Sequence, residues 1–275
     1  MTSLSPACYQ LYPALPHARV ESTEVIYTAG VIHRPQVISV RIVKRLIDLC
    51  VATLALLLAG WLFPLIAMAI VLDSRGPILY RQRRAGAFRG RAANGQPLFS
   101  EFEILKFRTM VVDAEKRTGV VLAAENDSRI TRVGRLLRRT RLDELPQLIS
   151  VLRGDMTLVG PRPERPELLS HLMDAIPFFE ERLHGVKPGI TGFAQVSLGY
   201  SGHALPGSDV ALHEADLVNP FGIDEARNAP ADDMRLKLLY DLAYVAALEN
   251  FWSFIKLELY VIVKTPWVML LGLGR

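Results

Sequence analysis

Residues 49–72 read Leu-Cys-Val-Ala-Thr-Leu-Ala-Leu-Leu-Leu-Ala-Gly-Trp-Leu-Phe-Pro-Leu-Ile-Ala-Met-Ala-Ile-Val-Leu and contain no charged side chain. At helical rise, a stretch of this length spans about 36 Å, which is enough to cross the core of a bilayer. Charge-free runs of this length are rare in soluble folds, so a buried soluble helix is the weakest interpretation of this segment.

The flanks of this run and the proline within it favour a re-entrant hairpin over a full span. Pro64 removes a helical hydrogen bond, which predicts that the helix breaks there. Arg41, Lys44 and Arg45 precede the run, and a cluster of arginines beginning at Arg75 follows it. Positive flanks stay on the cytoplasmic side, so a helix that enters, bends at Pro64 and returns satisfies both ends. A full span remains the alternative.

The chain beyond this run predicts a small, mainly helical α+β domain. Short strands are expected at 78–80 and 102–105, joined through a hairpin loop over the Gly- and Arg-rich residues 86–97. Apolar residues over 145–152 follow the i, i+3, i+4, i+7 spacing of an amphipathic helix, and Gly154 is expected to end it.

Three further segments complete the predicted organisation. Residues 1–36 mix proline, tyrosine and charge, which predicts a poorly ordered extension and no signal peptide. Residues 203–230 are rich in Gly, Pro, Asp and Asn and predict an inserted loop. The apolar residues 251–273 carry Trp252 and Trp267, which predicts one or two helices on a membrane surface, with a core helix as the alternative.

The basic residues are clustered, although the 275-residue chain has a formal net charge of only +4. Such clusters attract anionic lipid, phosphate or nucleic acid. One run contains no acid and consists of Arg75, Arg81, Arg83, Arg84, Arg89 and Arg91. The two cysteines are far apart and the six histidines show no HxxxH pairing, so neither a disulfide framework nor a histidine metal site is expected.

The residues that suggest chemistry are Asp143 and Glu144, which follow a block of arginines and open the predicted helix. A helix N-terminus attracts phosphate, and the arginines, Arg138 among them, would hold a diphosphate. One carboxylate can then attack phosphorus while the other takes a proton. Mg²⁺, held by carboxylate and phosphates, would screen the charge. The plainer alternative is that Asp143 caps the helix and Glu144 favours its dipole.

Four other basic residues are candidates for binding phosphate. Lys106 and Arg108 end a predicted strand, and Lys187 opens a tight Pro-Gly loop. Arg162 lies between two prolines, which stiffen its backbone and suit bidentate phosphate binding. Each has a plain alternative, such as a solvated strand end or a rigid turn.

Taken in order, these motifs resemble the monotopic polyprenyl-phosphate phosphoglycosyl transferases, the bacterial sugar transferase family. The resemblance covers about Val43 to Thr265. Its marks are Lys44-Arg45-Leu46-Ile47-Asp48, the helix broken at Pro64, Lys106-Phe107-Arg108-Thr109-Met110, Leu142-Asp143-Glu144-Leu145-Pro146-Gln147, Gly154-Asp155-Met156-Thr157-Leu158-Val159-Gly160-Pro161-Arg162-Pro163 and Pro188-Gly189-Ile190-Thr191-Gly192.

The resemblance implies a ping-pong reaction at the cytoplasmic face of the bacterial inner membrane. Asp143 would attack the β-phosphate of a UDP-sugar, UMP would leave, and polyprenyl (undecaprenyl) phosphate would accept the phospho-sugar. This would be the first membrane step of exopolysaccharide, O-antigen or capsule assembly. The resemblance also implies that Glu144 assists proton removal, that Asp143 touches Mg²⁺, and that Lys106, Arg138 and Arg162 lie near the phosphates.

The implied organisation is a re-entrant membrane hairpin at 37–77 and a catalytic domain at 78–275, in contact with membrane lipids. Lys187 and Phe193 stand where the family usually has Arg and Trp, which leaves the sugar and nucleotide preference open. A non-catalytic adaptor on anionic lipid and a transferase that moves the sugar alone are the alternatives. Nucleic acid is not an expected partner, because the apolar run has no role in that function. The oligomeric state is not predicted.

Overall fold

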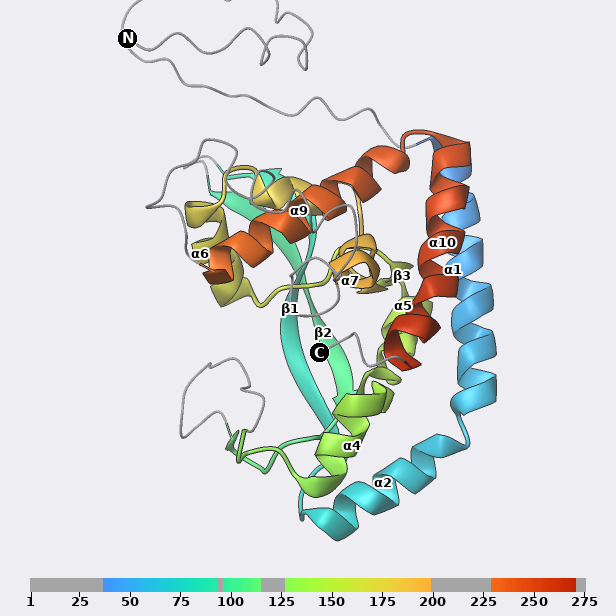
Figure 1. The fold of residues 1–275 in the computed structure, drawn as a ribbon, viewed down its shortest axis with the longest axis vertical. Coiled ribbons are helices and arrows are strands. Elements are labelled where there is room, and N and C mark those ends of the chain that lie inside the picture. Colours follow the sequence, from blue (N-terminus) through green and yellow to red (C-terminus); the bar gives the residue numbers. More distant parts are fainter. Residues whose placement is uncertain (1–36, 93–95, 115–126, 199–228, 271–275) are drawn as a thin grey trace, which may run out of the picture. The chain divides into compact units, whose positions relative to one another are not determined.

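The computed structural model describes residues 37–92, 96–114, 127–198 and 229–270. They form a mixed helix-and-strand fold with two small sheets (Figure 1). The α+β prediction is therefore confirmed. The extension at 1–36 and most of the predicted loop 203–230 lie outside the described residues, and the last two residues of that loop open helix α9 (Ala229–Ala247).

Helices α1 (Ile38–Ala59) and α2 (Leu62–Asp73) form a pair bent by 60°. Within the described ranges no single helix is long and apolar enough to cross a membrane. The two helices of this bent pair reach that length and apolar character only when they are taken together. The break lies at Gly60 and Trp61, so the prediction of a break at Pro64 is wrong by about one turn. Pro64 lies in the first turn of α2 and has no N–H for the carbonyl of Gly60 four residues earlier, so the helix breaks ahead of it.

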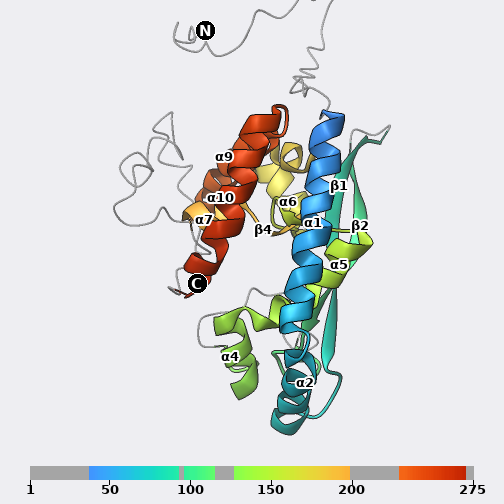
Figure 2. The same cartoon turned by 90° about the vertical axis from the view of Figure 1, so that its right-hand side faces the viewer.

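The charged N-terminal half of α1 anchors the helix to the rest of the fold, as the arrangement in Figure 2 illustrates. Arg45 donates a 2.7 Å hydrogen bond to the carbonyl of Val151 near the end of α5 (Gln147–Arg153). Asp48 is buried and accepts a 2.9 Å hydrogen bond from the backbone N–H of Leu158 in strand β3 (Thr157–Val159). These contacts leave the apolar half of α1 to continue away from them into α2.

Strands β1 (Leu79–Arg91) and β2 (Pro97–Phe107) form an antiparallel hairpin that is longer than predicted. Residues 86–91 were expected in a loop but remain paired, through register shifts between Ala85 and Phe88 and again before Gly90. Bulges of this kind let extra residues be accommodated without ending the ladder. The hairpin thus carries basic residues well beyond the strands expected from the sequence.

A second sheet, not predicted from the sequence, pairs β3 in parallel with β4 (Gly189–Thr191). The chain segments cross very closely here. A Cβ atom on Gly189 would lie 2.2 Å from the backbone N of Gly160, and one on Gly192 would lie 2.4 Å from the Gly160 carbonyl oxygen. Only glycine permits this approach. The crossing fixes the start of the segment that leads into Arg162.

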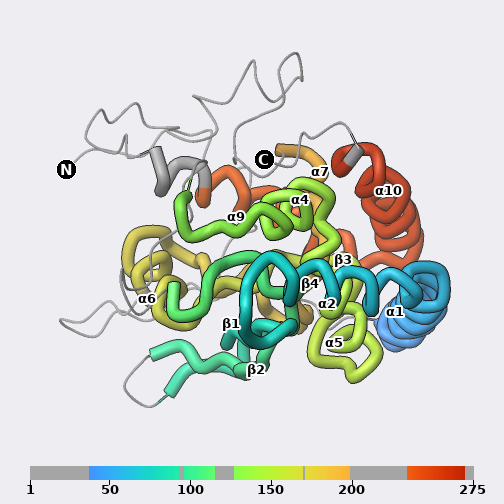
Figure 3. Tube along the Cα trace, turned by 90° about the horizontal axis from the view of Figure 1, so that it is seen from below, coloured from blue at the N-terminus to red at the C-terminus, as the bar shows by residue number. Residues whose placement is uncertain are grey.

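The C-terminal helices α9 and α10 (Phe251–Leu270) complete the main core, and α10 packs against α1 (Figure 3). Tyr244 is buried and donates a 2.8 Å hydrogen bond to the carbonyl of Val159. A helix was predicted over 251–273 and α10 confirms it as far as the described residues reach. The other elements are α4 (Arg132–Thr140), the 3₁₀ turns η2 (Leu142–Glu144) and η3 (Phe179–Leu183), α6 (Pro166–Ala175) and α7 (Phe193–Leu198).

Candidate active site

Asp143 and Glu144 lie in the 3₁₀ turn η2, between α4 and α5, and are only 7% and 6% exposed. Helix α4 ends at Arg141, which adopts a left-handed conformation with φ 57° and ψ 14°. This conformation costs a residue with a side chain about 1 kcal/mol, and such strain tends to be kept at functional turns. The reversal at Arg141 turns the chain so that both acids point into the fold.

The carboxylate of Asp143 is not used as a helix cap. No side-chain capping hydrogen bond forms at the start of η2 or of α5, and Pro146 occupies the N-cap position of α5. The Oδ1 atom of Asp143 is buried and has no hydrogen-bond partner in the part of the chain that the structure describes. The helix-capping interpretation of Asp143 is therefore wrong. A buried carboxylate oxygen without a partner is costly for the fold, which is typical of a group that awaits a ligand.

Glu144, in contrast, is held by cations. Its Oε1 atom lies 2.8 Å from Nζ of Lys106 and 3.2 Å from a guanidinium nitrogen of Arg162. Arg141 lies 3.9 Å away. Strand β2, turn η2 and the segment after β3 therefore meet at this one carboxylate.

These surroundings separate the two acids electrostatically. Burial, and after it the charge of neighbouring Glu144, raises the pKa of Asp143 to about 6. Burial also acts to raise the pKa of Glu144, but the charges of Lys106 and Arg162 outweigh it and hold that pKa well below its usual range. Glu144 is thus a fixed anion, whereas Asp143 titrates near neutral pH with one oxygen available.

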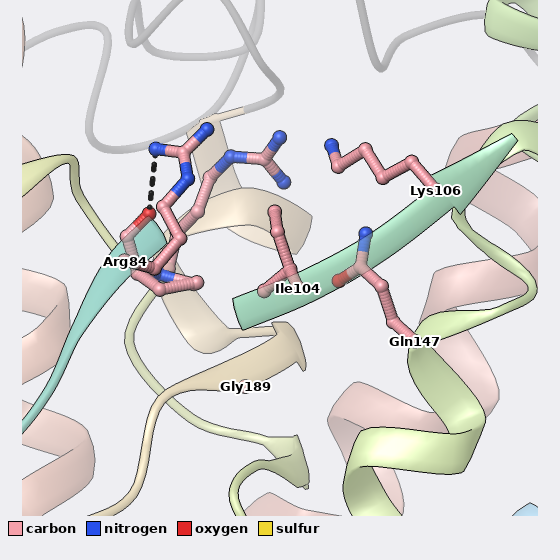
Figure 4. Close-up of a pocket in the computed structure, with 7 residues that line it drawn as sticks. Arg84, Ile104, Lys106, Gln147 and Gly189 are labelled. Atoms are coloured by element: carbon pink, nitrogen blue, oxygen red, sulfur yellow. Dashed lines mark hydrogen bonds between the residues drawn. The ribbon is translucent and has the colours of Figure 1, made fainter. Parts of the chain in front are cut away.

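A recess between the hairpin and the crossing of β3 with β4 is lined by Lys106 and Arg162, the two cations that contact Glu144 (Figure 4). Three basic side chains line it, namely Arg84, Lys106 and Arg162, with Ile104 and Gln147. Gln147 is buried and comes from the first turn of α5. The charge of this recess suits an anion of the size of a phosphate group.

Arg138 lies on the Asp143 side of the site. Its Nε atom donates a 2.8 Å hydrogen bond to Oγ1 of Thr109. Burial lowers the pKa of Arg138, and the negative charge of Asp143 acts against that shift, so the two side chains interact. The structure therefore brings together Asp143, Glu144, Lys106, Arg138 and Arg162 of the predicted site.

Two predicted phosphate-binding residues lie elsewhere. Arg108 is buried and donates hydrogen bonds to the carbonyls of Arg75, at 2.9 Å, and Ser74, so it ties the end of β2 to the end of α2. Lys187 is exposed, and its Nζ lies 3.5 Å from the position that a Cβ on Gly154 would take, at the end of α5. Among the described contacts, neither side chain forms an ion pair with Glu144, and the hydrogen bonds of Arg108 give it a structural role. The phosphate-binding role of the two residues stays a prediction.

Sequence reasoning missed two residues of the recess. Arg84 counted only as a member of an arginine run, and Gln147 only as the last residue of a quoted motif, with no role in the site. Residues that alternate along a strand point to opposite faces, so Arg83 and Arg84 lie on different faces of the hairpin. Which face carries the recess follows only from the register, in which Arg84 pairs with Phe102, two residues from Ile104 on the partner strand. That register depends on bulges that no short-range signal predicts.

Comparison with known proteins agrees with this geometry. Residues 39–272 match the family described as bacterial sugar transferase. The chain is 35% identical over 84% of its length to a UDP-N-acetylgalactosamine-undecaprenyl-phosphate N-acetylgalactosaminephosphotransferase of Aeromonas hydrophila. It is 40% identical over 66% of its length to the UDP-glucose:undecaprenyl-phosphate glucose-1-phosphate transferase of Escherichia coli (strain K12). It is 38% identical over 56% of its length to an exopolysaccharide production protein, PSS, of Rhizobium leguminosarum bv. phaseoli.

The matched segments cover 44% of the Aeromonas protein, 36% of the Escherichia protein and 74% of the Rhizobium protein. The family match itself extends over most of the chain and includes every residue of the Asp143–Glu144 cluster. On this evidence the resemblance noted in the motifs is confirmed, and the chain belongs to the bacterial sugar transferase family.

Proposed function

We propose that this chain transfers a sugar 1-phosphate from a UDP-sugar to polyprenyl phosphate and releases UMP. The observation that carries the proposal is the unpartnered, buried Oδ1 of Asp143, next in the chain to Glu144, whose partners Lys106 and Arg162 line a basic recess. The Aeromonas and Escherichia relatives are named as undecaprenyl-phosphate sugar phosphotransferases, which supports this choice of donor and acceptor. The name of the Rhizobium relative supports a role in exopolysaccharide synthesis.

The reaction proceeds in two balanced steps. In the first, a carboxylate oxygen of Asp143 forms a bond to the β-phosphorus of the donor, and the bond from that phosphorus to the bridging oxygen breaks, so UMP leaves with the electron pair. In the second, a phosphate oxygen of the acceptor attacks the same phosphorus and releases the Asp143 carboxylate. The sugar stays on its phosphate throughout.

Lys106, Arg162 and Arg138 provide the positive charge that a diphosphate and an attacking carboxylate require. All three approach the two acids from different elements, and Lys106 and Arg162 are fixed by Glu144. Cations that are held in position before the reaction do not have to reorganise as charge moves to the leaving phosphate.

The contacts of Glu144 support a positioning role for it. The resemblance implies that Glu144 assists proton removal, yet a carboxylate whose pKa is held far below its usual range is a weak base. A phosphate monoester is already largely ionised at neutral pH, since its second pKa is about 6. We therefore assign Glu144 to holding Lys106 and Arg162 at the recess.

Mg²⁺ fits this site only together with a substrate. Among the described residues no group of three or more His, Cys, Asp or Glu side chains gathers to hold a metal. Mg²⁺ commonly binds one or two carboxylates and completes its shell with phosphate oxygens and water. Asp143, with its available oxygen, is the residue that would hold the ion, and the ion would supply charge neutralisation at the diphosphate.

The bent pair α1–α2 supports a re-entrant mode of membrane binding at the cytoplasmic face of the inner membrane. The pair is rich in exposed large apolar side chains, and a soluble surface rarely carries a patch of this kind. More than half exposed are Ile38, Ile42, Leu46, Leu54, Leu57, Leu58, Trp61, Met68 and Leu72. The charged half of α1 is instead bound to α5 and β3, so one end of α1 stays with the catalytic residues.

Product analysis with the purified full chain in detergent tests the proposal. Incubation with polyprenyl phosphate and a panel of UDP-sugars is expected to release UMP, and a donor labelled at the β-phosphate is expected to leave label on the protein when acceptor is omitted. Asp143→Asn should abolish both, while Asp174→Asn, an exposed acid on α6, should change neither. Release of UDP would indicate transfer of the sugar alone, and absence of any release would favour the adaptor.

A further inference from the structure

Arg84 on β1 reaches the same recess as the cations of the candidate active site. In the hairpin register Gln82 pairs with Ile104 and Arg84 pairs with Phe102, two positions further along. Paired residues of an antiparallel hairpin point to one face, so Arg84 shares its face with Ile104 and Lys106 of β2, as Figure 4 shows. Arg81 and Arg83 point to the opposite face and are 72% and 69% exposed.

Arg84 carries a partly buried charge on which Glu164 and Glu144 act without an ion-pair contact. Its guanidinium donates hydrogen bonds to neutral oxygens, the carbonyl of Pro163 at 3.1 Å and the side chain of Gln82 at 2.7 Å. Its Nε atom is buried and has no partner, and across the described residues no carboxylate forms an ion pair with it. Burying a charge in this way is costly unless an anion compensates for it.

The neighbouring charges agree with an excess of positive charge in the recess. Burial, followed by the charge of Arg162, lowers the pKa of Arg84 to about 10. Burial and the charge of Arg162 also lower the pKa of Lys106, against the effect of Glu144. Arg162 therefore acts on both neighbours. Glu144 forms ion pairs with Lys106 and Arg162 but not with Arg84, which is the cation of the recess left for a ligand.

We propose that Arg84 binds the α-phosphate of the nucleotide donor, the phosphate that departs with UMP. The inference rests on the proposed function. Attack by Asp143 on the β-phosphorus directs the leaving group to the side away from Asp143. Lys106, on which the charge of Asp143 acts, and Arg84 line opposite sides of the recess (Figure 4). The recess is small, with about 10 Å³ open to the centre of a water-sized group, so it admits an oxygen of a phosphate group and not the whole nucleotide-sugar.

The test compares Arg84→Gln and Arg84→Lys with Arg83→Gln as the matched control on the solvent face of the same strand. Loss of one charge-assisted hydrogen bond is expected to raise both KM for the UDP-sugar and the inhibition constant for UMP by about 10- to 100-fold in Arg84→Gln. Arg84→Lys should recover part of that loss. The KM for polyprenyl phosphate should not change. Arg83→Gln should have the same KM for the UDP-sugar and the same inhibition constant for UMP as the wild-type chain.

A binding measurement separates this role from a purely structural one. UMP, but not uridine, is expected to raise the unfolding temperature of the unchanged chain and of Arg83→Gln, and to have little effect on Arg84→Gln. If Arg84→Gln is too unstable to purify, the same UMP-induced shift of the unfolding temperature is measured on Arg84→Lys, for which a reduced shift is expected. A variant that keeps its response to UMP and its KM for the donor overturns the assignment of Arg84. Failure of the unchanged chain to release UMP would overturn the proposed function instead.

Discussion

Lys106 on β2 and Glu144 on η2 are 38 residues apart in the sequence and are joined by a 2.8 Å hydrogen bond within a largely buried ion pair. Through this contact the hairpin fixes the carboxylate that follows Asp143 in the chain. The adjacent Asp143 is left with a buried oxygen that has no partner. The two acids are therefore neighbours in sequence but differ in what they are free to bind.

The first half-reaction should follow the ionisation of Asp143. Only the carboxylate attacks phosphorus, and its pKa is raised to about 6. The rate of a single turnover should therefore rise about tenfold per pH unit below that value and level off above it. UMP release measured without acceptor checks this, because the acceptor phosphate also titrates near pH 6. A flat profile between pH 5 and 8 would contradict the assignment.

Asp143→Asn should stabilise the fold at neutral pH. The folded chain binds the Asp143 proton more tightly than the unfolded chain, whose pKa is near 3.8, so ionisation destabilises the fold as pH rises from about 4 to about 6. Asn carries no such penalty and should gain about 1–3 kcal/mol at pH 7.5. Thermal unfolding at pH 7.5 and pH 4 measures the difference, which should vanish at the lower pH. A less stable Asn variant at pH 7.5 would be the opposite result.

Lys106→Met should cost about 3–5 kcal/mol of unfolding free energy, because it removes the nearest partner of a buried anion. In a double-mutant cycle with Glu144→Gln, the double variant should be more stable than the sum of the single effects predicts, since no charge is then left unpaired. The exposed pair Arg81 and Glu103, 3.5 Å apart, serves as control and should show coupling near zero. Additive effects at Lys106 and Glu144 would argue against the ion pair.

Asp73→Ala should weaken α4 and lower activity together. Oδ2 of Asp73, the last residue of α2, accepts a 2.9 Å hydrogen bond from the backbone N–H of Val133 in the first turn of α4. Loss of such a capping contact costs about 1 kcal/mol. Asp73→Asn should retain most of it. Thr131→Ala removes the cap at Gly134 and also the Thr131 hydrogen bond to Asp73, so it should destabilise α4 as well. The rate of UMP release measures the activity, and chemical denaturation measures the free energy of unfolding.

Arg108→Met should destabilise the fold without affecting the donor. The buried guanidinium binds the carbonyls of Ser74 and Arg75, and its loss leaves these groups without a partner, at a cost of about 1–3 kcal/mol. The KM for the UDP-sugar should stay within about twofold of that of the unchanged chain. Exposed Lys187→Ala should alter neither quantity. A large rise in KM for either variant would restore the residue to the substrate site.

Local patterns predicted the parts of this molecule that depend on nearest neighbours. The charge-free run gave two apolar helices, the apolar spacing over 145–152 gave α5, and Gly154 ends that helix in a left-handed conformation with φ 89°. The adjacency of Asp143 to Glu144 is itself a property of the sequence. These features need no knowledge of where distant segments lie.

One part that was wrong is local: the break lies ahead of Pro64 because its ring and missing N–H act on the preceding turn. The other parts depend on distant partners. Arg108 is held by carbonyls at the end of α2, and the place of Arg84 depends on the register of a bulged hairpin. The sequence shows that Arg84 and Arg108 are basic, but only the tertiary contacts decide which of the two guanidinium groups can reach a ligand.

The crossing at Gly160, Gly189 and Gly192 sets a limit on how this chain can vary. Each added Cβ would meet backbone atoms at 2.6 Å or less, which no change of rotamer relieves. A saturation library should therefore return glycine alone at these three positions, even under selection for stability only.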